Sequence, residues 1–527
     1  MTRPDVPRPA LDPEILEASE EVATRPGPPA RPLGLTPDGR LKAGRLAGLT
    51  MGGAIWVLAW PVMLESFLNS LVGLTDTVLA AGIDTATTDA VGVATYAMWF
   101  TGLIIMALGM GATALISRSV GKRRLAVASA ALGQSMLLGM VAGVVLGVFL
   151  WLAAPGFAGL VNMSGPARDA FMTYLRILAF GLPLETVMFV LIACARGAGD
   201  NMTPLWAMVA RNIVNVIVSF SLAGVDLTST RIVDGEAVRT VIFANPFGFD
   251  MGVRGIALGT VLSDVLGLVL VLIAACSGRW GITLRARRMR PHWHTLRRIV
   301  RVGLPNFVET LGMWVGNFMV LIVVGFLNEP GLFGVHALAI RIESLSFLPG
   351  FAMGMAAATL AGQYLGAGSP DMARRAVLIC TGVSVAIMGL MGAALLVVPG
   401  PIVGVLSDQA IHLHETPALL MLAGVMQVPF AMAIVFRQAL RGVGDVRVVL
   451  LITWITTYLV RLPLTFLLSG ADIPIPAWAG GGVIENPSPV AWGLWGVWLG
   501  LSAEVVAVRA PLFAIRFLRG DWAKARV

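Results

Sequence analysis

Acidic and amide side chains share one face of the first long apolar segment of the chain, residues 52–80. Glu65, Asn69 and Asp76 fall within roughly 40° of one another on a helix that turns 100° per residue. An ionisable group costs about 2.5–3.5 kcal/mol at the centre of a membrane helix, so it must face protein or water. We interpret the stripe as the wall of a polar cavity; the alternative is a stripe of structural hydrogen bonds.

Two kinds of chemistry fit a carboxylate in such a wall. A carboxyl group among apolar side chains holds its proton more tightly than in water, and it can exchange that proton near neutral pH. A carboxylate can equally coordinate Na⁺ together with nearby carbonyl and amide oxygens. We therefore predict that the stripe binds a coupling cation, either H⁺ or Na⁺.

A proline and a second polar face accompany the stripe. Pro61 lies one turn before its first carboxylate, and a proline inside a helix removes one hydrogen bond and permits a bend. In the fifth apolar segment, Asn212, Asn215 and Ser219 share one helix face. We predict that Pro61 is a hinge and that these residues complete the cation pocket.

The second half of the chain carries different polar residues. Glu309 occupies the place of the first carboxylate of the stripe, whereas Met313 and Val320 occupy the places of Asn69 and Asp76. Cation coupling is therefore expected mainly in the first half. Glu309 is expected to hold a cationic substrate or a second ion.

Further intramembrane residues are candidates for the substrate cavity. His336 and Glu343 share a helix face, and Arg341 is displaced by about 200° from Glu343. Together with Gln363 they are candidates for a substrate site; a gate or an internal ion-pair network is the alternative. Glu185, two residues after a proline, is a further coupling candidate. The other intramembrane charges, which we interpret as fasteners between helices, are Asp264, Arg437, Arg461, Glu504 and Arg509.

Twelve apolar segments must position these residues. A membrane span needs about 20 apolar residues. Of 527 residues, 57% are hydrophobic and only 13% are charged, against about 25% charged in soluble domains. The segments lie near 52–80, 90–117, 126–152, 170–194, 203–224, 252–277, 302–326, 333–360, 375–398, 416–439, 446–469 and 491–516.

The last six segments repeat the first six. The pentapeptide Arg-Gly-Ala-Gly-Asp at 196–200 recurs 245 residues later as Arg-Gly-Val-Gly-Asp at 441–445. Duplicated halves are the usual build of secondary transporters. We predict an all-α integral membrane protein with twelve transmembrane helices in two six-helix pseudo-symmetric lobes, residues 47–280 and 302–520.

The distribution of charge predicts the orientation in the membrane. Residues 279–301 carry eight arginines and no acid, and short basic loops stay in the cytoplasm. We expect a basic cytoplasmic linker at 281–301 and a cytoplasmic tail at 521–527. The protein should span the inner (plasma) membrane several times, with both termini in the cytoplasm. Residues 1–46 hold nine prolines and no apolar run, so we expect a disordered cytoplasmic tail and no signal peptide.

Motifs for ATP use, metal binding and catalysis are missing from the sequence. No Walker A pattern occurs, and the His-x-His pairs at 292–294 and 412–414 lack a third ligand. The three cysteines fall within spans and suit packing rather than disulfides. We expect no enzyme activity, no cofactor apart from the coupling ion, and no nucleic-acid partner, because anionic lipid suits the basic linker better.

These motifs together resemble the MATE (multidrug and toxic compound extrusion) family, over about residues 47–522. The resemblance rests on Pro61 with Asp76 fifteen residues later, on the pentapeptide at 196–200, and on two runs in the second half. Those runs are His-Ala-Leu-Ala-Ile-Arg-Ile-Glu-Ser-Leu at 336–345 and Gly-Gln-Tyr-Leu-Gly at 362–366. Within the family, the chain is most similar to the bacterial branch that includes the DNA-damage-inducible type.

The resemblance implies two lobes around a V-shaped cavity and an antiport reaction. H⁺ or Na⁺ enters while an organic, often cationic, compound leaves by alternating access. It also implies that Asp76 binds the coupling ion and that the first span bends at Pro61. Related proteins often add an Asn-x-x-x-Asp in the fifth span, but here Asn215 is followed by Ser219. Glu65 or Glu185 would then have to supply a second carboxylate.

Two other functions compete with drug efflux. A flippase for a lipid-linked saccharide, as in the wider superfamily, requires several basic residues in the cavity for a diphosphate. A channel or membrane enzyme is disfavoured by the duplicated halves, the bendable first span and the missing catalytic motif. We expect a monomer whose partners are a small organic substrate, the coupling cation and the lipid bilayer.

Overall fold

The computed structural model describes residues 34–160, 163–233, 236–327, 329, 331–407, 409–474 and 481–524. The first lobe contains α2 (Met51–Ile83), α3 (Thr85–Gly121), α4 (Leu125–Leu160), α5 (Gly165–Ala198), α6 (Met202–Ala223) and α7 (Val253–Ser277). The second lobe contains α8 (Trp293–Gly325), α9 (Leu332–Gly366), α10 (Pro370–Val397), α11 (Pro399–Leu406) and α12 (Ala410–Gly442). Its last two spans are built from α13 (Val446–Trp454), η2 (Ile455–Arg461) and α14 (Leu462–Ser469), then α15 (Gly493–Glu504), η4 (Val505–Arg509) and α16 (Ala510–Leu518).

Twelve of these helices or helix runs are long and apolar enough to cross a membrane, which confirms the predicted number. Most exceed the predicted segments because polar turns extend the helices past the apolar stretch. The outer face of α4 shows the surface that lipid would cover. Val141, Val145, Val148 and Leu152 follow one helical stripe, and each is more than half exposed.

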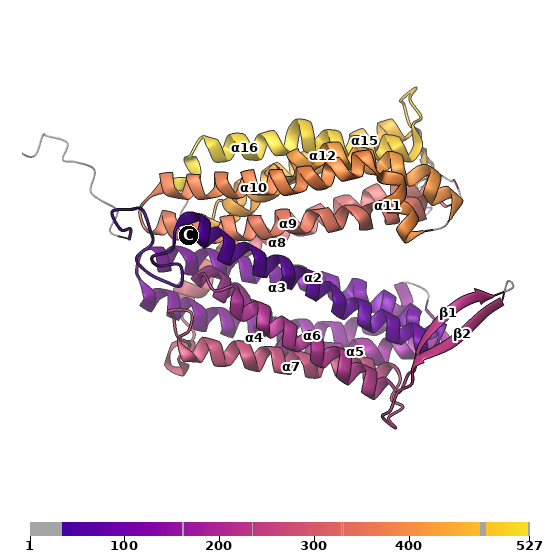
Figure 1. The fold of residues 1–527 in the computed structure, drawn as a ribbon, viewed down its shortest axis with the longest axis horizontal. Helices are drawn as coiled ribbons and strands as arrows, with labels where there is room; N and C mark the ends of the chain where they lie inside the picture. The colour runs from indigo at the N-terminus through magenta and orange to yellow at the C-terminus, as the bar shows by residue number, and fades with distance from the viewer. Residues whose placement is uncertain are drawn as a thin grey trace, which may run out of the picture.

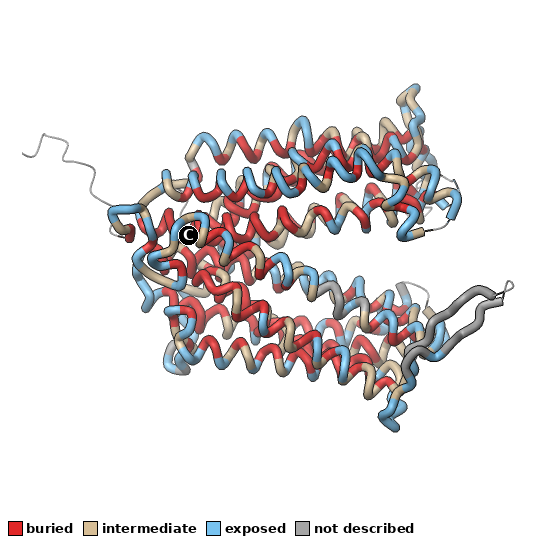
Figure 2. The backbone as a smooth tube through the Cα atoms, viewed as in Figure 1, coloured by how far each residue is buried: buried red, intermediate tan, exposed pale blue. Residues whose placement is uncertain are grey.

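Each lobe packs around separate apolar cores at its two ends. In the first lobe, one core contains Leu115, Val187 and Trp280, and the other contains Phe171 and Leu182. The second lobe has the same division into two large cores. Figure 2 shows the buried backbone concentrated inside the lobes and the exposed backbone on their outer faces and at their ends.

The two lobes converge at one end of the molecule and diverge at the other (Figure 1). We call the converging end the basic end, because residues 34–50 and the arginine-rich segment 279–301 lie there. We call the other end the hairpin end, after the antiparallel strands β1 (Leu227–Val233) and β2 (Glu236–Phe243). A second short pair, β3 (Ile473–Pro474) and β4 (Val483–Ile484), occupies the corresponding connection of the second lobe.

Two glycines permit the close approach of the lobes at the basic end. A Cβ atom on Gly121, the last residue of α3, would overlap the backbone carbonyl of Gln363 in α9. A Cβ atom on Gly366, the last residue of α9, would likewise overlap the backbone of Arg118 in α3. Two helices from different lobes therefore meet backbone to backbone, and larger side chains would hold them apart.

Residues 34–46 correct the prediction of a disordered tail. Leu35, Leu41 and Leu46 are 7%, 3% and 1% exposed, and they pack into the second-lobe core at the basic end. Three leucines within twelve residues are enough to dock a short segment, although they form no apolar run. Residues 1–33 of the predicted tail lie outside the described residues.

The predicted linker at 281–301 also needs correction. It contains the short helix η1 (Ala286–Met289), and α8 already begins at Trp293. The first turns of α8 are basic, so a hydropathy pattern detects the helix only where it becomes apolar. The side chain of Trp293 is 76% exposed at this start, as is common for tryptophan at a membrane–water interface.

Candidate functional site

A cavity of about 460 Å³ lies among α2, α3, α5 and α7, and it reaches α9 and α12 on the side of the basic end. Its walls mix apolar side chains with a small set of charged ones. Those charged residues are Glu65, Asp76, Glu185, Asp264, Arg196, Arg211 and Arg441. Four of the seven are acids, so the cavity can accept positive charge.

Asp76 is the centre of a hydrogen-bond network in the cavity wall, and it is 5% exposed. The Tyr174 hydroxyl donates to Asp76 Oδ2 at 2.7 Å, and Thr260 Oγ1 donates to the same oxygen at 3.1 Å. Asn215 Nδ2 donates in turn to Thr260 Oγ1 at 3.1 Å and contacts Ser219 Oγ at 3.3 Å. The structure thus joins the predicted Asp76 and Asn215 through a threonine from α7.

Asn215 leaves one polar atom of this network open. Its Oδ1 is buried and has no hydrogen-bond partner among the described residues. A buried amide oxygen without a donor is costly and needs a partner such as water, a proton donor or a cation. The oxygens of Asp76, Tyr174 and Thr260 offer ligands that suit either Na⁺ or a bound proton, and Asn215 is joined to them through Thr260.

A second group of charges lies beside this network. Arg211 Nε donates to Asp264 Oδ1 at 2.5 Å, and both side chains are 4% exposed. Glu185 also lines the cavity and interacts electrostatically with Arg211 and Asp264. One arginine thus faces three carboxylates, counting Asp76, and the group has an acidic excess when all are ionised. Asp264 lies in the cavity rather than serving only as the fastener that we expected.

Sequence reasoning missed three participants of the site. Tyr174 and Thr260 carry no signal, because tyrosine and threonine are ordinary residues of membrane helices. Arg211 did carry one, since an arginine in the middle of an apolar segment is costly. It directly precedes Asn212, on the helix that we had already identified as polar.

The remaining first-lobe predictions are placed differently. Glu65 lines the cavity but is neutralised by Arg196, whose Nη2 lies 2.5 Å from Glu65 Oε1. The side chain of Asn69 lies outside the described residues. Asn212 donates to the carbonyl of Met208 at 2.7 Å within its own helix. Neither Glu65 nor Asn212 has a described hydrogen bond to Asp76, so the predicted common cluster is only partly formed.

Glu309 lies in an internal ion pair and not in an open substrate cavity. It is fully buried, pairs closely with Arg441, and has Arg437 Nη1 at 3.7 Å. Thr453 Oγ1 donates to Glu309 Oε1 at 2.8 Å, the oxygen that Arg437 also faces, whereas Arg441 contacts Oε2. The carboxylate is therefore already satisfied by protein groups, which corrects its expected contact with a substrate or a second ion.

His336 and Gln363 are also outside the cavity. His336 accepts a hydrogen bond from Trp498 Nε1 at 3.1 Å inside the second lobe. Gln363 donates to the carbonyl of Gly197 at 3.1 Å where the lobes meet at the basic end. Helical spacing identified which face each residue shares, but it could not show which neighbour covers that face.

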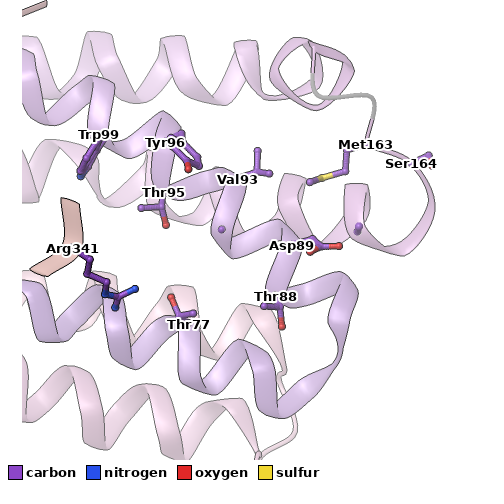
Figure 3. Close-up of a pocket in the computed structure, with 12 residues that line it drawn as sticks. Thr77, Thr88, Asp89, Val93, Thr95, Tyr96, Trp99, Met163, Ser164 and Arg341 are labelled. Carbon is purple, nitrogen blue, oxygen red and sulfur yellow. The ribbon is translucent and has the colours of Figure 1, made fainter. Parts of the chain in front are cut away.

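Arg341 lines a second, wider pocket of about 900 Å³ toward the hairpin end. Figure 3 shows the Arg341 side chain pointing from the second lobe toward Thr77 of the first lobe. Glu343, two residues later, interacts electrostatically with Arg461. Arg461 and Arg509 both pair with Glu504, at 3.0 and 2.7 Å. Arg461, Arg509 and Glu504 thus form an internal ion-pair network beside Glu343, whereas Arg341 lines the pocket.

Comparisons with known proteins identify the class. The MatE family model matches residues 61–221 and again residues 305–467, so the duplicated halves each carry one copy. A probable multidrug resistance protein NorM of Thermotoga maritima is 28% identical over 477 residues, which cover 89% of this chain and 93% of the relative. The multidrug resistance protein MdtK of Pectobacterium atrosepticum is 23% identical, with 89% of this chain and 96% of the relative covered.

The fold agrees with this result. A crystal structure described as MATE in the bent conformation superimposes with a TM-score of 0.77 at 20% identity, covering 90% of this chain and 96% of that chain. The protein is therefore a polytopic membrane protein built like a transporter. It belongs to the MatE family, as the motifs of its sequence predicted, and the particular branch remains a prediction.

Proposed function

We propose that this protein is a secondary active antiporter, which exports organic and mainly cationic drugs or toxins in exchange for H⁺ or Na⁺. Its relatives are named as multidrug resistance proteins. The observation that carries the proposal is the Asp76 network, in which a buried carboxylate meets hydroxyl and amide groups at the wall of an acidic cavity. A positive charge is the ligand that this wall favours.

Asp76 and its neighbours can hold either coupling ion. The hydroxyl groups of Tyr174 and Thr260 can rotate, so they donate to an ionised carboxylate and accept from a protonated one. Binding of one positive charge at Asp76 reduces the acidic excess of the cavity and weakens its attraction for a cationic drug. Exchange of the two is the electrostatic basis of antiport, in which the coupling ion and the substrate compete.

We further propose that the protein lies in the inner membrane with its basic end on the cytoplasmic side. Arginines are concentrated there, as the positive-inside rule requires. The closed contact between α3 and α9 then blocks the cytoplasmic side, and the diverging lobes open the cavity toward the outside. In this proposed orientation the conformation is outward-open, and we propose that the protein works as a monomer.

The flippase alternative is disfavoured by the pairing of the cavity arginines. Such a substrate needs free cations for its diphosphate. Arg196 pairs with Glu65, Arg211 with Asp264, and Arg441 with Glu309, so the three arginines of the 460 Å³ cavity are already neutralised, and the wider pocket adds Arg341 alone among its described lining residues.

The decisive experiment is ethidium efflux from proteoliposomes under separate H⁺ and Na⁺ gradients. Wild type should export the dye under one gradient and Asp76→Asn should not, which would also identify the coupling ion. Asp371→Asn, at an exposed site near the basic end, is the control for the loss of one carboxylate. Full export by Asp76→Asn would remove Asp76 from the mechanism, and no dye export by wild type would refute the substrate class.

A further inference from the structure

The helix that carries Asp76 contains Pro61, which has no backbone N–H to donate to the preceding turn. The proline leaves the carbonyl of Val57 without its helical donor and crowds the turn that contains it. Asn201, which directly precedes α6, donates from its Nδ2 to the neighbouring carbonyl of Leu58 at 2.5 Å. A residue outside α2 thus holds the helix on the N-terminal side of Pro61.

The C-terminal side of Pro61 is held from the same place. Glu65 lies one turn after Pro61 and pairs with Arg196 at 2.5 Å. Arg196 lies in the last turn of α5 and Asn201 directly precedes α6; we call residues 196–201 the α5–α6 junction. The junction therefore holds α2 on both sides of its proline.

The α5–α6 junction also carries contacts between the lobes. Thr359 Oγ1 of α9 donates to the Arg196 carbonyl at 3.2 Å, and Gln363 Nε2 donates to the Gly197 carbonyl at 3.1 Å. Leu46 of the docked N-terminal segment packs on Gly199, where an added Cβ would lie 2.8 Å from Leu46 Cγ. One short segment thus contacts the hinge helix, the second lobe and the N-terminal segment.

The repeated half provides a comparison within the same chain. Arg441 pairs with Glu309 as Arg196 pairs with Glu65, so the ion pair is common to both halves. Position 446, which corresponds to Asn201, is a valine, and its side chain has no group that could donate to a carbonyl. The connection to the carbonyl before the proline is therefore a specialisation of the first lobe, the lobe that contains the Asp76 network.

We propose that Asn201 and Arg196 are positioning residues that couple the Pro61 bend of α2 to closure of the lobes at the basic end. Bending α2 at Pro61 pulls on its contacts with Asn201 and Arg196. Both residues belong to the α5–α6 junction, which accepts hydrogen bonds from α9 at the Arg196 and Gly197 carbonyls. Opening of the basic end and bending of α2 then occur together. This inference rests on the proposed transport function only for its purpose, because the coupling itself is conformational.

The test measures distances between spin labels in the full-length protein, in nanodiscs without substrate or gradient. The exposed Cys276 is first replaced by serine; Cys194 and Cys380 are buried. One label pair, at Arg124 and Arg374, reports on the basic end; a second pair, at Arg168 and His414, reports on the hairpin end. All four label positions are exposed.

Asn201→Val should increase the population that is open at the basic end by about fivefold, the effect of losing one hydrogen bond of average strength, about 1 kcal/mol. The distance across the basic end should lengthen in that population while the distance across the hairpin end shortens. Asp371→Asn, the exposed control used for the transport assay, should alter neither distance. Because a fold defect would lower the unfolding temperature without such opposed changes, the unfolding temperature is measured in parallel.

A charge reversal tests the second contact. Arg196→Glu alone should increase the same open population, and the double variant Glu65→Arg/Arg196→Glu should restore the wild-type distances. Unchanged distances in Asn201→Val with a lowered unfolding temperature would overturn the proposal, as would a failure of the double variant to restore them. If the distances change as expected but wild type exports no dye, the coupling stands and the proposed function is what fails.

Discussion

The buried pair of Glu309 and Arg441 leads to a stability prediction that can be worked out from the two halves of the chain. Their side chains are 0% and 3% exposed. Removing one partner of a fully buried pair costs about 3–5 kcal/mol, since it leaves a charge without compensation. Glu309 would retain Arg437 at 3.7 Å and Thr453 at 2.8 Å. We therefore expect Arg441→Met to cost about 3 kcal/mol, the lower limit of that range.

The equivalent pair of the first lobe should matter less. Both arginines line the cavity, but the Arg196 side chain is 18% exposed against 3% for Arg441, so water reaches the carboxylate that removal of Arg196 leaves behind more easily. We expect Arg196→Met to cost about 1–2 kcal/mol, between the values for exposed and buried pairs. The ranking of the two variants follows from burial alone, because both remove the same type of side chain from equivalent positions.

The assay is unfolding in mixed micelles, followed by helical circular dichroism as the fraction of denaturing detergent rises. The double variant Glu309→Gln/Arg441→Met should recover most of the loss, because it leaves no bare charge. If the double variant is as unstable as Arg441→Met, the cost lies in lost packing of the arginine stem and not in the uncompensated carboxylate. Equal losses for Arg196→Met and Arg441→Met would refute the argument from burial.

Two further predictions concern the site and one helix end. Tyr174→Phe removes a hydroxyl that donates to Asp76 at 2.7 Å; the coupling-ion concentration at half-maximal dye export should change by about tenfold or more, with Tyr174→Trp as a non-conservative comparison. Asp84, between α2 and α3, accepts from the Thr87 backbone N–H at 2.6 Å as an N-cap, and this bond lowers its pKa below the ordinary 3.8. Asp84→Ala should cost about 0.5–2 kcal/mol at neutral pH. A carboxyl group whose pKa is lowered by folding stabilises the fold only above the pKa that it has in the unfolded chain. The difference from wild type should therefore diminish below that pKa and vanish once the pH falls below the folded pKa. A difference that persists in acid would exclude the cap as its cause.

The fold was largely predictable from the sequence because membrane spans are set by length and hydropathy. The pentapeptide repeat located both lobes, and the equivalence of Glu65 and Glu309 proved to be structural, since each pairs with the arginine of its own pentapeptide. The docked residues 34–46 were not predicted, because their three leucines are spread among prolines, glycines and charges. No hydropathy pattern shows which surface will cover such a segment.

The site was predictable only where a residue is unusual for its surroundings. Asp76 and Asn215 are costly in a membrane helix and therefore visible, and the structure connects them. Thr260, which makes the connection, is not unusual anywhere in a span. Gln363 is unusual for its position and was still misplaced, because polarity shows that a side chain needs a partner and does not show whether that partner is a ligand or a backbone carbonyl.

The division of each lobe into two apolar cores has a mechanical consequence. In the first lobe the core around Trp280 and the core around Phe171 are tightly packed blocks, whereas the cavity between them is lined by charged and hydroxyl side chains. Close-packed apolar cores resist deformation, whereas a cavity whose side chains can exchange hydrogen bonds deforms more easily. The lobe should therefore move as two rigid parts that meet at the cavity. The ion or substrate bound in the cavity then sets the angle between the two parts, so ion binding and the shape of the lobe change together.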